Sequence, residues 1–253
     1  MTARSQMRRE KISALVAERG EVSVEEIASL FGASHETIRR DLATLEDAGF
    51  LLKIHGGAKR VPMLTEGSFD ERMGENRAAK QSIAEKLAGW LPPDQTIFMD
   101  TGSTTLVGAE ALAQTTNLRV VTNSLKIAST LSSGADGPEV FLLGGRLERG
   151  NLETLGPTTI EEINRFNTDL AVITIGSLNA TDGTSDYSFD EAQVARAMIS
   201  RASRTVVLAD HSKFDRRAAF QVCPIAEIDV LISDLTPGAA LASALRAAGA
   251  SLL

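Results

Sequence analysis

One stretch of the chain, residues 34–42, combines residue types and a spacing that suit contact with nucleic acid. It runs Ser-His-Glu-Thr-Ile-Arg-Arg-Asp-Leu. The leading serine is a good helix cap, and Ile38, Leu42 and Leu45 recur at a helical spacing that places them on one buried stripe. Arginine side chains near the exposed start of such a helix fork onto guanine edges or pair with phosphates. We therefore expect this helix to enter the major groove of DNA.

The outward and flanking side chains of this helix are the candidate DNA contacts. They are Ser34, His35, Glu36, Thr37, Arg39, Arg40 and Thr44. Ser34 and Thr37 carry hydroxyls for phosphates or a thymine edge, whereas Asp41 lies nearer the buried side and is expected to pair with a neighbouring cation. The residues alone leave one alternative open, which is a solvated helical face with ordinary charges.

Two earlier helical patterns are needed to position this helix. Residues 6–19 carry Ile12, Leu15 and Val16 on one side, and Gly20 ends the pattern. The sequence Ser-Val-Glu-Glu at residues 23–26 matches a capping box and predicts a second helix. A turn at Gly32-Ala33 then leads into the third helix, which we expect to extend to about Ala48. This order is typical of a helix-turn-helix.

A basic hairpin is predicted directly after the helices. Residues 50–61 form two short apolar-rich runs around Gly56-Gly57, which is a hairpin pattern. A hairpin in this place is a wing whose cations lie along the DNA backbone. The candidate wing contacts are Lys53, His55, Lys59 and Arg60. For His55 the alternative of a simple turn residue stays open.

The run Thr-Ile-Arg-Arg-Asp-Leu at residues 37–42, followed by His-Gly-Gly-Ala at 55–58, resembles the N-terminal signature of the DeoR family of bacterial transcriptional regulators. The resemblance spans roughly residues 5–60 and is very specific. Ala33 departs from it, because the family more often has valine before the serine. The departure is expected to alter packing in the turn rather than the DNA face.

Composition sets the broad class of protein. The chain has 253 residues, of which 43% are hydrophobic and 23% charged, which is ordinary for a soluble protein of one or two domains. The net charge is −7, yet residues 1–60 carry ten Lys/Arg against nine Asp/Glu. Because salt screens charges beyond about 10 Å, a local basic face can still bind DNA. An acidic remainder is expected to discourage nonspecific adhesion.

Several classes of site are not supported by the sequence. No stretch approaches the roughly 18 unbroken apolar residues of a membrane helix, and the first residues lack the apolar core of a signal peptide. Cys223, the single cysteine, cannot form an internal disulfide and is expected to be a small buried hydrophobe. The three histidines lack metal-ligand spacing, and no nucleotide-hydrolysing loop appears. We expect a cytoplasmic protein with no membrane contact, no metal and no cofactor.

The rest of the chain alternates predicted strands and helices. A polar segment, residues 62–76, is interpreted as a linker, and residues 77–90 follow as a helix. Apolar runs that predict strands lie at residues 96–99, 118–121, 139–143, 170–175, 205–209 and 230–233. Such strands, separated by helices, predict an α/β fold with a mainly parallel sheet covered on both faces. The predicted domains are residues 1–61 and 77–253, joined by the linker.

Polar residues follow the carboxyl ends of four predicted strands, where ligands bind in sheets of this kind. Small residues and hydroxyls before a helix suit an anion, Lys213 is the natural phosphate cation, and Asp100 or Asp210 would accept sugar hydroxyls. The candidate effector contacts are Asp100, Thr101, Gly102, Ser103, Thr104, Thr122, Asn123, Gly144, Gly145, Arg146, Asp210 and Lys213. Two alternatives stay open: Asp210 capping the following turn, and Arg146 in a surface salt bridge.

These motifs resemble the C-terminal effector domain of DeoR-type regulators, over roughly residues 75–235. The resemblance implies a fold similar to ribose-5-phosphate isomerase and a sensor for a phosphorylated sugar or polyol. Many relatives have lysine at the position of Ala195, so its loss would mark a different effector subgroup. Residues 186–190 are expected near the pocket mouth, where they would influence ligand choice.

The leading interpretation is a repressor of a sugar or polyol catabolic operon, released from double-stranded operator DNA by a phosphorylated intermediate. Because one small domain offers few contacts, a homo-oligomer, dimer or tetramer, is expected to bind repeated half-sites. The rival interpretation is a sugar-phosphate isomerase-like enzyme with an appended helical domain. Isomerisation needs a carboxylate base and a second group that stabilises the enediolate, and no such pair is legible in the sequence.

Overall fold

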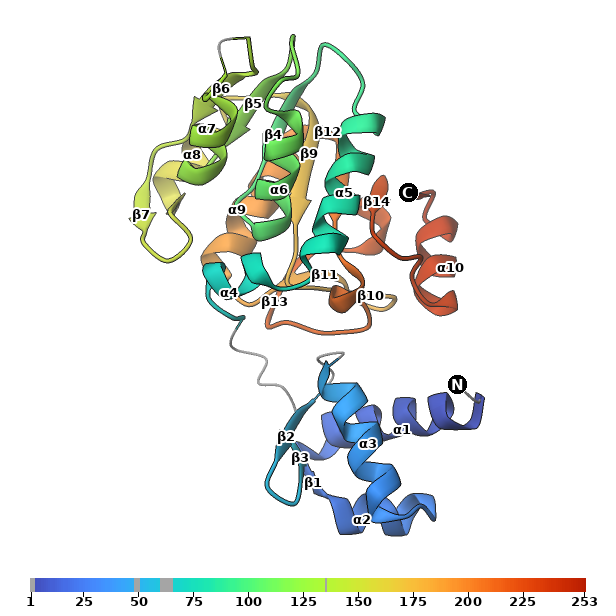
Figure 1. Ribbon diagram of the computed structural model, residues 1–253. Coiled ribbons are helices and arrows are strands. Elements are labelled where there is room, and N and C mark those ends of the chain that lie inside the picture. Colours follow the sequence, from blue (N-terminus) through green and yellow to red (C-terminus); the bar gives the residue numbers. More distant parts are fainter. Residues whose placement is uncertain (1–2, 48–50, 60–65, 135) are drawn as a thin grey trace. The chain divides into compact units, whose positions relative to one another are not determined.

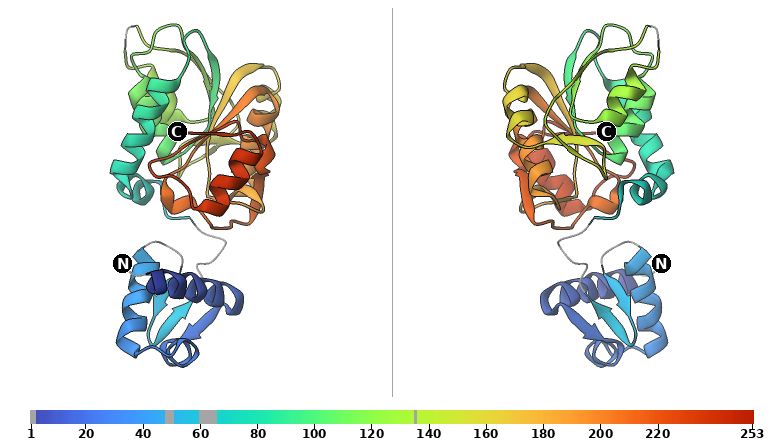
Figure 2. Two further views of the ribbon diagram at one scale, coloured as in Figure 1. Left: turned by 90° about the vertical axis from the view of Figure 1, so that its right-hand side faces the viewer. Right: turned by 90° about the vertical axis from the view of Figure 1, so that its left-hand side faces the viewer.

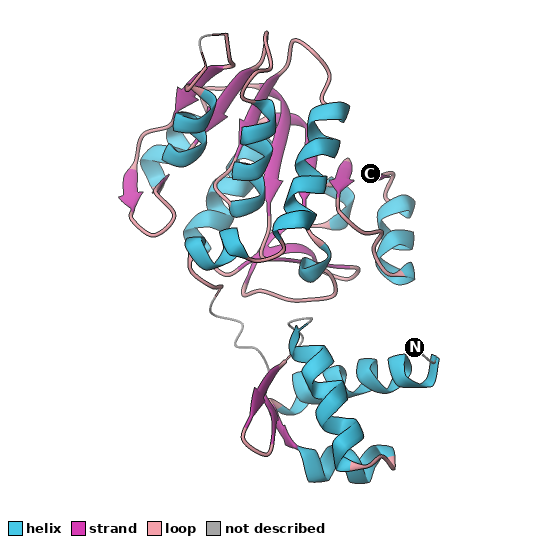
Figure 3. Cartoon of the chain, viewed as in Figure 1, coloured by secondary structure: helices cyan, strands magenta, loops and turns pink. Residues whose placement is uncertain are grey.

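The computed structural model describes residues 3–47, 51–59, 66–134 and 136–253. The chain divides into two compact units, residues 1–63 and 64–253. Figure 1 labels the elements of both units, and Figure 3 distinguishes helices from strands. Within the described ranges, none of the helices combines the length and the apolar character that crossing a membrane requires.

The first unit contains three helices and a three-stranded antiparallel sheet (Figure 1). The helices are α1 (Ala3–Arg19), α2 (Val24–Phe31) and α3 (His35–Asp47). The strands, in sheet order, are β1 (Glu21–Ser23), β3 (Gly57–Lys59) and β2 (Leu52–Ile54). Apolar side chains from all three helices and from β1 and β3 form one core. The predicted helix-turn-helix and hairpin are confirmed, and β1 adds a third strand that the sequence did not predict.

Local capping explains where α2 begins and ends. The Ser23 hydroxyl accepts a hydrogen bond from the Glu26 N–H at 3.1 Å, and Gly32 adopts the left-handed conformation after the helix, with φ 58°. That conformation is accessible to glycine at little cost. The predicted capping box is only half realised, because the Glu26 carboxylate pairs with Arg19 instead.

The second unit is built on a seven-stranded parallel sheet in the order β15-β14-β12-β9-β4-β5-β6. The strands are β4 (Thr96–Met99), β5 (Arg119–Thr122), β6 (Glu139–Leu142), β9 (Thr168–Thr174), β12 (Ala202–Leu208), β14 (Val230–Ile232) and β15 (Ser251–Leu252). Two small antiparallel sheets accompany it. They contain β7 (Arg146–Glu148) with β8 (Glu153–Leu155), and β10 (Ser177–Asn179) with β11 (Gly183–Asp186) and β13 (Phe220–Cys223).

Helices cover both faces of the large sheet, as Figure 2 shows from two sides. The helices are α4 (Phe69–Gly74), α5 (Arg77–Trp90), α6 (Ser103–Leu112), α7 (Leu125–Leu131), α8 (Pro157–Ile163), α9 (Phe189–Ser200) and α10 (Ala239–Ala247), with short 3-10 turns η1 (His211–Lys213) and η2 (Ile225–Glu227). Ile97 and Met99 pack with α4 to α7, whereas Phe98 between them packs with α8 to α10. This alternation confirms the predicted α/β sheet buried on both faces.

Part of the segment predicted to be a linker is a helix. Helix α4 begins with a complete capping box between Ser68 and Glu71, and Phe69 is buried in the core beside the sheet. At the other end, the buried Lys80 ammonium donates to the Glu75 carbonyl at 2.9 Å. A six-residue helix is too short to show periodicity and depends on such tertiary contacts, which explains why the sequence did not predict it.

The start of α6 depends on a close approach between Gly102 and Thr174. A Cβ atom at position 102 would lie 2.0 Å from Thr174 Cγ2, although the extended backbone there, with φ −177°, accepts any residue. We expect Gly102→Ala to lower the free energy of unfolding by about 1–3 kcal/mol because it overpacks this contact. Urea denaturation measures the change.

A matched substitution isolates the contact from general effects of adding a methyl group. In Gly89→Ala, near the end of α5, the new Cβ meets nothing within 4 Å, so we expect a neutral effect or a gain of up to about 1 kcal/mol. Adding Thr174→Ser to Gly102→Ala should recover part of the loss, since it removes the clashing methyl. Equal urea midpoints for the two glycine variants would contradict the argument.

Candidate functional site

Helix α3 presents the predicted DNA contacts on one side of the first unit. Ser34 lies just before it, and its hydroxyl oxygen accepts from the Thr37 N–H at 3.3 Å and lies 2.9 Å from the Thr37 hydroxyl. Ile38 and Leu42 are buried on the opposite side. The exposed candidates on the helix are His35, Glu36, Arg39, Arg40 and Thr44.

The two charged residues at positions 40 and 41 point in different directions. The Arg40 side chain is 80% exposed, and its nearest carboxylate, on Glu36, is 4.0 Å away. A long, exposed pair of this kind contributes little, so the Arg40 guanidinium remains available to DNA. Asp41 is buried and accepts a hydrogen bond from Arg8 Nε at 2.6 Å. It therefore pairs with a neighbouring cation, as expected, and ties α3 to α1.

The wing carries three of the predicted contacts within the described residues. Lys53 and Lys59 are exposed on β2 and β3, and His55 is exposed in the turn between them. The Lys53 N–H donates to Glu46 at 2.8 Å, and its ammonium lies 3.4 Å from the same carboxylate, which fixes the wing against α3. Arg60, the fourth predicted contact, lies outside the described residues.

A groove of about 520 Å³ lies beside the helix-turn-helix. Lys11 and Arg8 from α1 line it on one side, and Ser34 and Thr37 on the other. The groove places these two cations next to the start of α3.

In the second unit, three candidate residues from two strand ends meet. The buried Asp100 carboxylate follows β4 and accepts from the Thr174 N–H at 2.9 and 3.1 Å, which joins the ends of β4 and β9. The Thr101 hydroxyl donates to Asn123 Oδ1 at 3.2 Å, and the Asn123 amide donates to Glu153 at 3.1 Å. These candidates share one small cavity, whose lining is Asp100, Thr101, Asn123, Glu153, Asp186, Glu191, Val194 and Ala195.

Other candidates have local structural contacts. Ser103 and Thr104 are buried at the start of α6, and the Thr122 hydroxyl oxygen accepts from the Ser124 N–H at 3.1 Å. The Gly144 N–H donates to Glu162, and its carbonyl accepts from the Thr159 hydroxyl at 2.8 Å. In the described part of the chain, the candidate effector positions that line neither this cavity nor a larger pocket beside it are Gly102, Ser103, Thr104, Thr122, Gly144, Gly145, Arg146, Asp210 and Lys213.

Arg146 and Asp210 both make the structural contact that the sequence analysis left open as an alternative to effector binding. Arg146 is 63% exposed and pairs with Asp190 at 2.6 Å. Asp210 is buried, and its carboxylate accepts from the Ser212 N–H at 2.9 Å and from Asn76 Nδ2 at 3.1 Å. The first of these bonds caps η1, as the alternative interpretation proposed.

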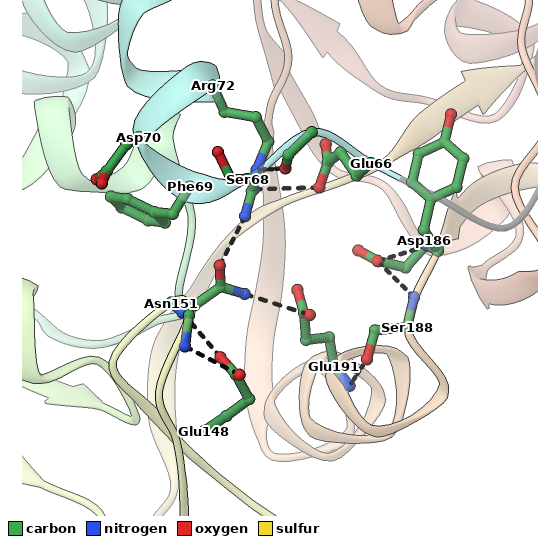
Figure 4. Close-up of a pocket in the computed structure, with 13 residues that line it drawn as sticks. Glu66, Ser68, Phe69, Asp70, Arg72, Glu148, Asn151, Asp186, Ser188 and Glu191 are labelled. Carbon is green, nitrogen blue, oxygen red and sulfur yellow. Dashed lines mark hydrogen bonds and ion pairs between the residues drawn. The ribbon is translucent and has the colours of Figure 1, made fainter.

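A larger pocket of about 510 Å³ adjoins the small cavity and shares Asp186 and Glu191 with it (Figure 4). Its lining is Glu66, Gly67, Ser68, Phe69, Asp70, Arg72, Glu148, Gly150, Asn151, Asp186, Tyr187, Ser188 and Glu191. Three of the residues at 186–190 lie in this wall, where the sequence placed them. Residues 66–72 were missed, because they fall in the segment interpreted as a linker and the clue was only the Ser-Phe-Asp-Glu capping pattern at 68–71.

A chain of polar contacts runs along the wall of this pocket. Glu66 accepts from Lys213 Nζ at 2.6 Å and pairs with Arg72 at 3.1 Å. Arg72 also donates to Asn151 Oδ1 at 2.9 Å, and the Asn151 amide donates to Glu153 at 2.9 Å. Figure 4 shows Arg72 between Glu66 and Asn151. Lys213, a candidate from the sequence, is thus connected to the small cavity through residues that the sequence did not single out.

The small cavity is strongly acidic. Burial raises the pKa of Asp100 well above its usual range and that of Glu153 to about 7. Burial, followed by repulsion from Glu153 and Asp186, raises the pKa of Glu191 to about 9. Ala195 lines the same cavity and supplies no cation. The described carboxylates do not form a group placed to hold a metal ion. The arrangement places polar groups in the small cavity and the Arg72 guanidinium in the wall of the larger pocket, where Glu66 links it to Lys213.

Family profiles match both units of the chain. A DeoR-like helix-turn-helix domain matches residues 8–62, and a DeoR C-terminal sensor domain matches residues 75–235. The HTH-type transcriptional repressor CsqR of Escherichia coli K12 is 32% identical over 239 residues, covering 94% of this chain and 91% of that protein. The glycerol-3-phosphate regulon repressor of the same strain is 32% identical over 223 residues and 88% of each chain.

Among solved structures, ribose 5-phosphate isomerase A from Methanocaldococcus jannaschii covers 55% of each chain at 16% identity, with a TM-score of 0.40. The relatives that match over most of their length are transcriptional repressors, so the rival interpretation as an enzyme is not supported. On the strength of two matching profiles that together span most of its length, the chain belongs to the DeoR family and is a DNA-binding transcriptional regulator rather than an enzyme.

Proposed function

We propose that the protein represses sugar or polyol catabolic genes and leaves its operator when a phosphorylated sugar or polyol occupies the pocket of the second unit. The observation that carries this proposal is the ion pair between Glu66 and Lys213. Glu66 belongs to the pocket wall and directly follows residues 60–65, which lead from the DNA-binding unit. The relative named as a glycerol-3-phosphate regulon repressor supports the ligand class.

For the operator, we assign base and phosphate contacts to the exposed face of α3 and to the wing. Arg39 and Arg40 are placed for guanine edges or phosphates, and the wing lysines for the backbone. Homo-oligomers would bring two such DNA-binding units to repeated half-sites. Arg60 stays a prediction from the sequence.

For the effector, we assign the phosphate to the outer wall and the hydroxyls to the interior. The described lining of the small cavity has four carboxyl groups and no lysine or arginine to bind a phosphate, whereas Lys213 and Arg72 lie together around Glu66. Thr101, Asn123 and Asp100 would then meet sugar or polyol hydroxyls. The strand-end positions that line neither cavity stay predictions from the sequence.

The effector would act by exchanging one anion for another. Glu66 and a phosphate compete for the same two cations, and phosphate brings more charge and more acceptor oxygens. Once the phosphate holds Lys213 and Arg72, Glu66 loses both partners and the start of the 66–72 segment loses its anchor. A coupling of about 1–3 kcal/mol changes operator affinity roughly 5- to 150-fold, so this exchange is energetically sufficient.

Substitutions at the two ends of the Glu66–Lys213 pair should have opposite effects. Lys213→Ala should raise the effector concentration for half-saturation about ten- to hundredfold, since a charge-assisted hydrogen bond is worth about 1.5–3 kcal/mol. Glu66→Gln should lower it, because the competing carboxylate is neutralised. The half-saturation concentration of each variant is measured by thermal shift and by release from a promoter fragment. The probes are glycerol 3-phosphate, ribose 5-phosphate and inorganic phosphate.

Lys86→Ala is the matched control, because the Lys86 ammonium donates at 2.6 Å to the carbonyl of Ser233, which is not part of the pocket wall, whereas Lys213 is bonded to the wall residue Glu66. It should leave half-saturation unchanged. Identical titrations for Lys213→Ala, Glu66→Gln and the unmodified protein would refute the phosphate assignment while leaving the DNA-binding function intact.

Arg40→Ala tests the operator contact. We expect weaker binding to the promoter fragment at every effector concentration. If Arg40 contacts a phosphate, the slope of log affinity against log salt concentration should fall in magnitude by about one. If Arg40 contacts a base, the variant should lose about 1–3 kcal/mol of binding free energy and its specificity at one base position. Arg165→Ala removes an exposed cation from the second unit as a control for net charge. Binding equal to that of the control would remove Arg40 from the interface.

Stability should depend on pH through the acidic cavity. The pKa of Glu191 is raised from 4.5 to about 9, so the folded state holds a proton that the unfolded state releases. The contribution of this proton to the free energy of unfolding is fully present below pH 4.5 and is lost as the pH rises through 9. We expect the melting temperature to fall between pH 6 and 9, and Glu191→Gln to flatten that fall. Glu110→Gln, at an exposed position, is the control. Parallel curves of melting temperature against pH for the unmodified protein and the two variants would contradict the assignment.

A further inference from the structure

Strand β6 is an edge of the seven-stranded sheet with unusual side chains for that position. Its Phe141 and Leu142 are 39% and 50% exposed. Edge strands in monomeric proteins are commonly protected by charges, bulges or covering segments. Within the strand itself, the one charged residue is Glu139, which already pairs with Arg119 of β5 at 3.1 Å.

The hydrogen bonds to β5 show which backbone groups of β6 point away from the sheet. The Glu139 N–H donates to the Leu118 carbonyl and the Leu143 N–H to the Thr122 carbonyl, each at 2.9 Å. Because backbone groups alternate along a strand, Val140 and Leu142 direct their N–H and C=O groups outward.

The flanking residues restrict how a second strand can pair with this edge. Two positions before Val140 is Pro138, which has no N–H, and two positions after Leu142 is Gly144, whose N–H is bonded to Glu162. A two-fold axis at Phe141 pairs Val140 of one copy with Leu142 of the other, and the reverse. In each Val140–Leu142 pair, both outward N–H groups and both outward C=O groups are then hydrogen-bonded. Neither Pro138 nor Gly144 takes part.

Side chains favour the same axis. Phe141 packs edge-on against Phe166 at 5.6 Å, and Phe166 against Phe98 at 6.3 Å, so two Phe141 rings at the axis would extend one aromatic row into both cores.

We propose that two copies of this chain associate through antiparallel pairing of β6 with β6, about an axis at Phe141. A second copy is the occupant because the edge is complementary to itself in this register and because an operator of repeated half-sites requires paired heads. The pairing goes beyond the proposed regulation by effector, and its test does not depend on DNA or on ligand.

Disulfide trapping tests the register in the full-length chain. Residues opposite each other at a non-hydrogen-bonded position have Cα atoms about 4.5 Å apart, which a disulfide spans. Phe141→Cys should therefore form a reducible dimer rapidly under mild oxidation. Leu142→Cys, one position from the axis, faces Val140 rather than itself and should cross-link at least tenfold more slowly. The native Cys223 is buried, so the background should be low.

Sedimentation of an edge variant tests the same surface without cysteine. Leu142→Lys places a charge on the exposed edge and should halve the mass of the assembly at micromolar concentration. Leu235→Lys alters another exposed leucine, which is 57% exposed, and should leave the mass unchanged. An unmodified protein that sediments as a monomer, a Leu142→Lys assembly of unchanged mass, or equal cross-linking of the two cysteine variants would overturn the proposal.

Discussion

A carboxylate shared between two cations, Glu66 between Lys213 and Arg72, is the interaction on which the sensor unit depends. All three groups are largely buried, so removal of one partner leaves charge without compensation, which is costly. Under the proposed function, an anionic ligand would displace Glu66 because it would supply the missing charge itself. The contact would then hold the 66–72 segment without a ligand and release it when a phosphate binds.

The parallel sheet explains why polar groups accumulate where they do. Both of its faces are filled by apolar side chains, so the strand ends are the places left for Asp100, Asn123 and their partners. Several of these groups bond to each other and tie neighbouring strands together. Burial raises the pKa of Glu153 and Glu191, and repulsion from neighbouring carboxylates adds to the shift.

In the DNA-binding unit, the buried and exposed sides of α3 have separate roles. The Asp41 carboxylate is held by Arg8 and is buried at the α1–α3 contact, so it does not weaken the positive potential of the exposed arginines. The wing is fixed to α3 by Glu46, which gives the two elements a defined mutual position. A rigid head of this kind gains specificity when a second copy fixes the spacing of two heads.

The sequence by itself determined the helix-turn-helix, the wing and the parallel sheet, because each depends on local periodicity, caps and turns within short stretches. It also grouped Asp100, Thr101 and Asn123, which line one cavity in the structure, since residues at strand ends share an edge in this type of sheet. Only the tertiary structure decided that α4 belongs to the pocket wall, that Glu66 meets both Arg72 and Lys213, and that Arg146 and Asp210 have structural partners. Those contacts join residues as many as 147 positions apart, and their energies come from burial and charge pairing, which no local pattern encodes.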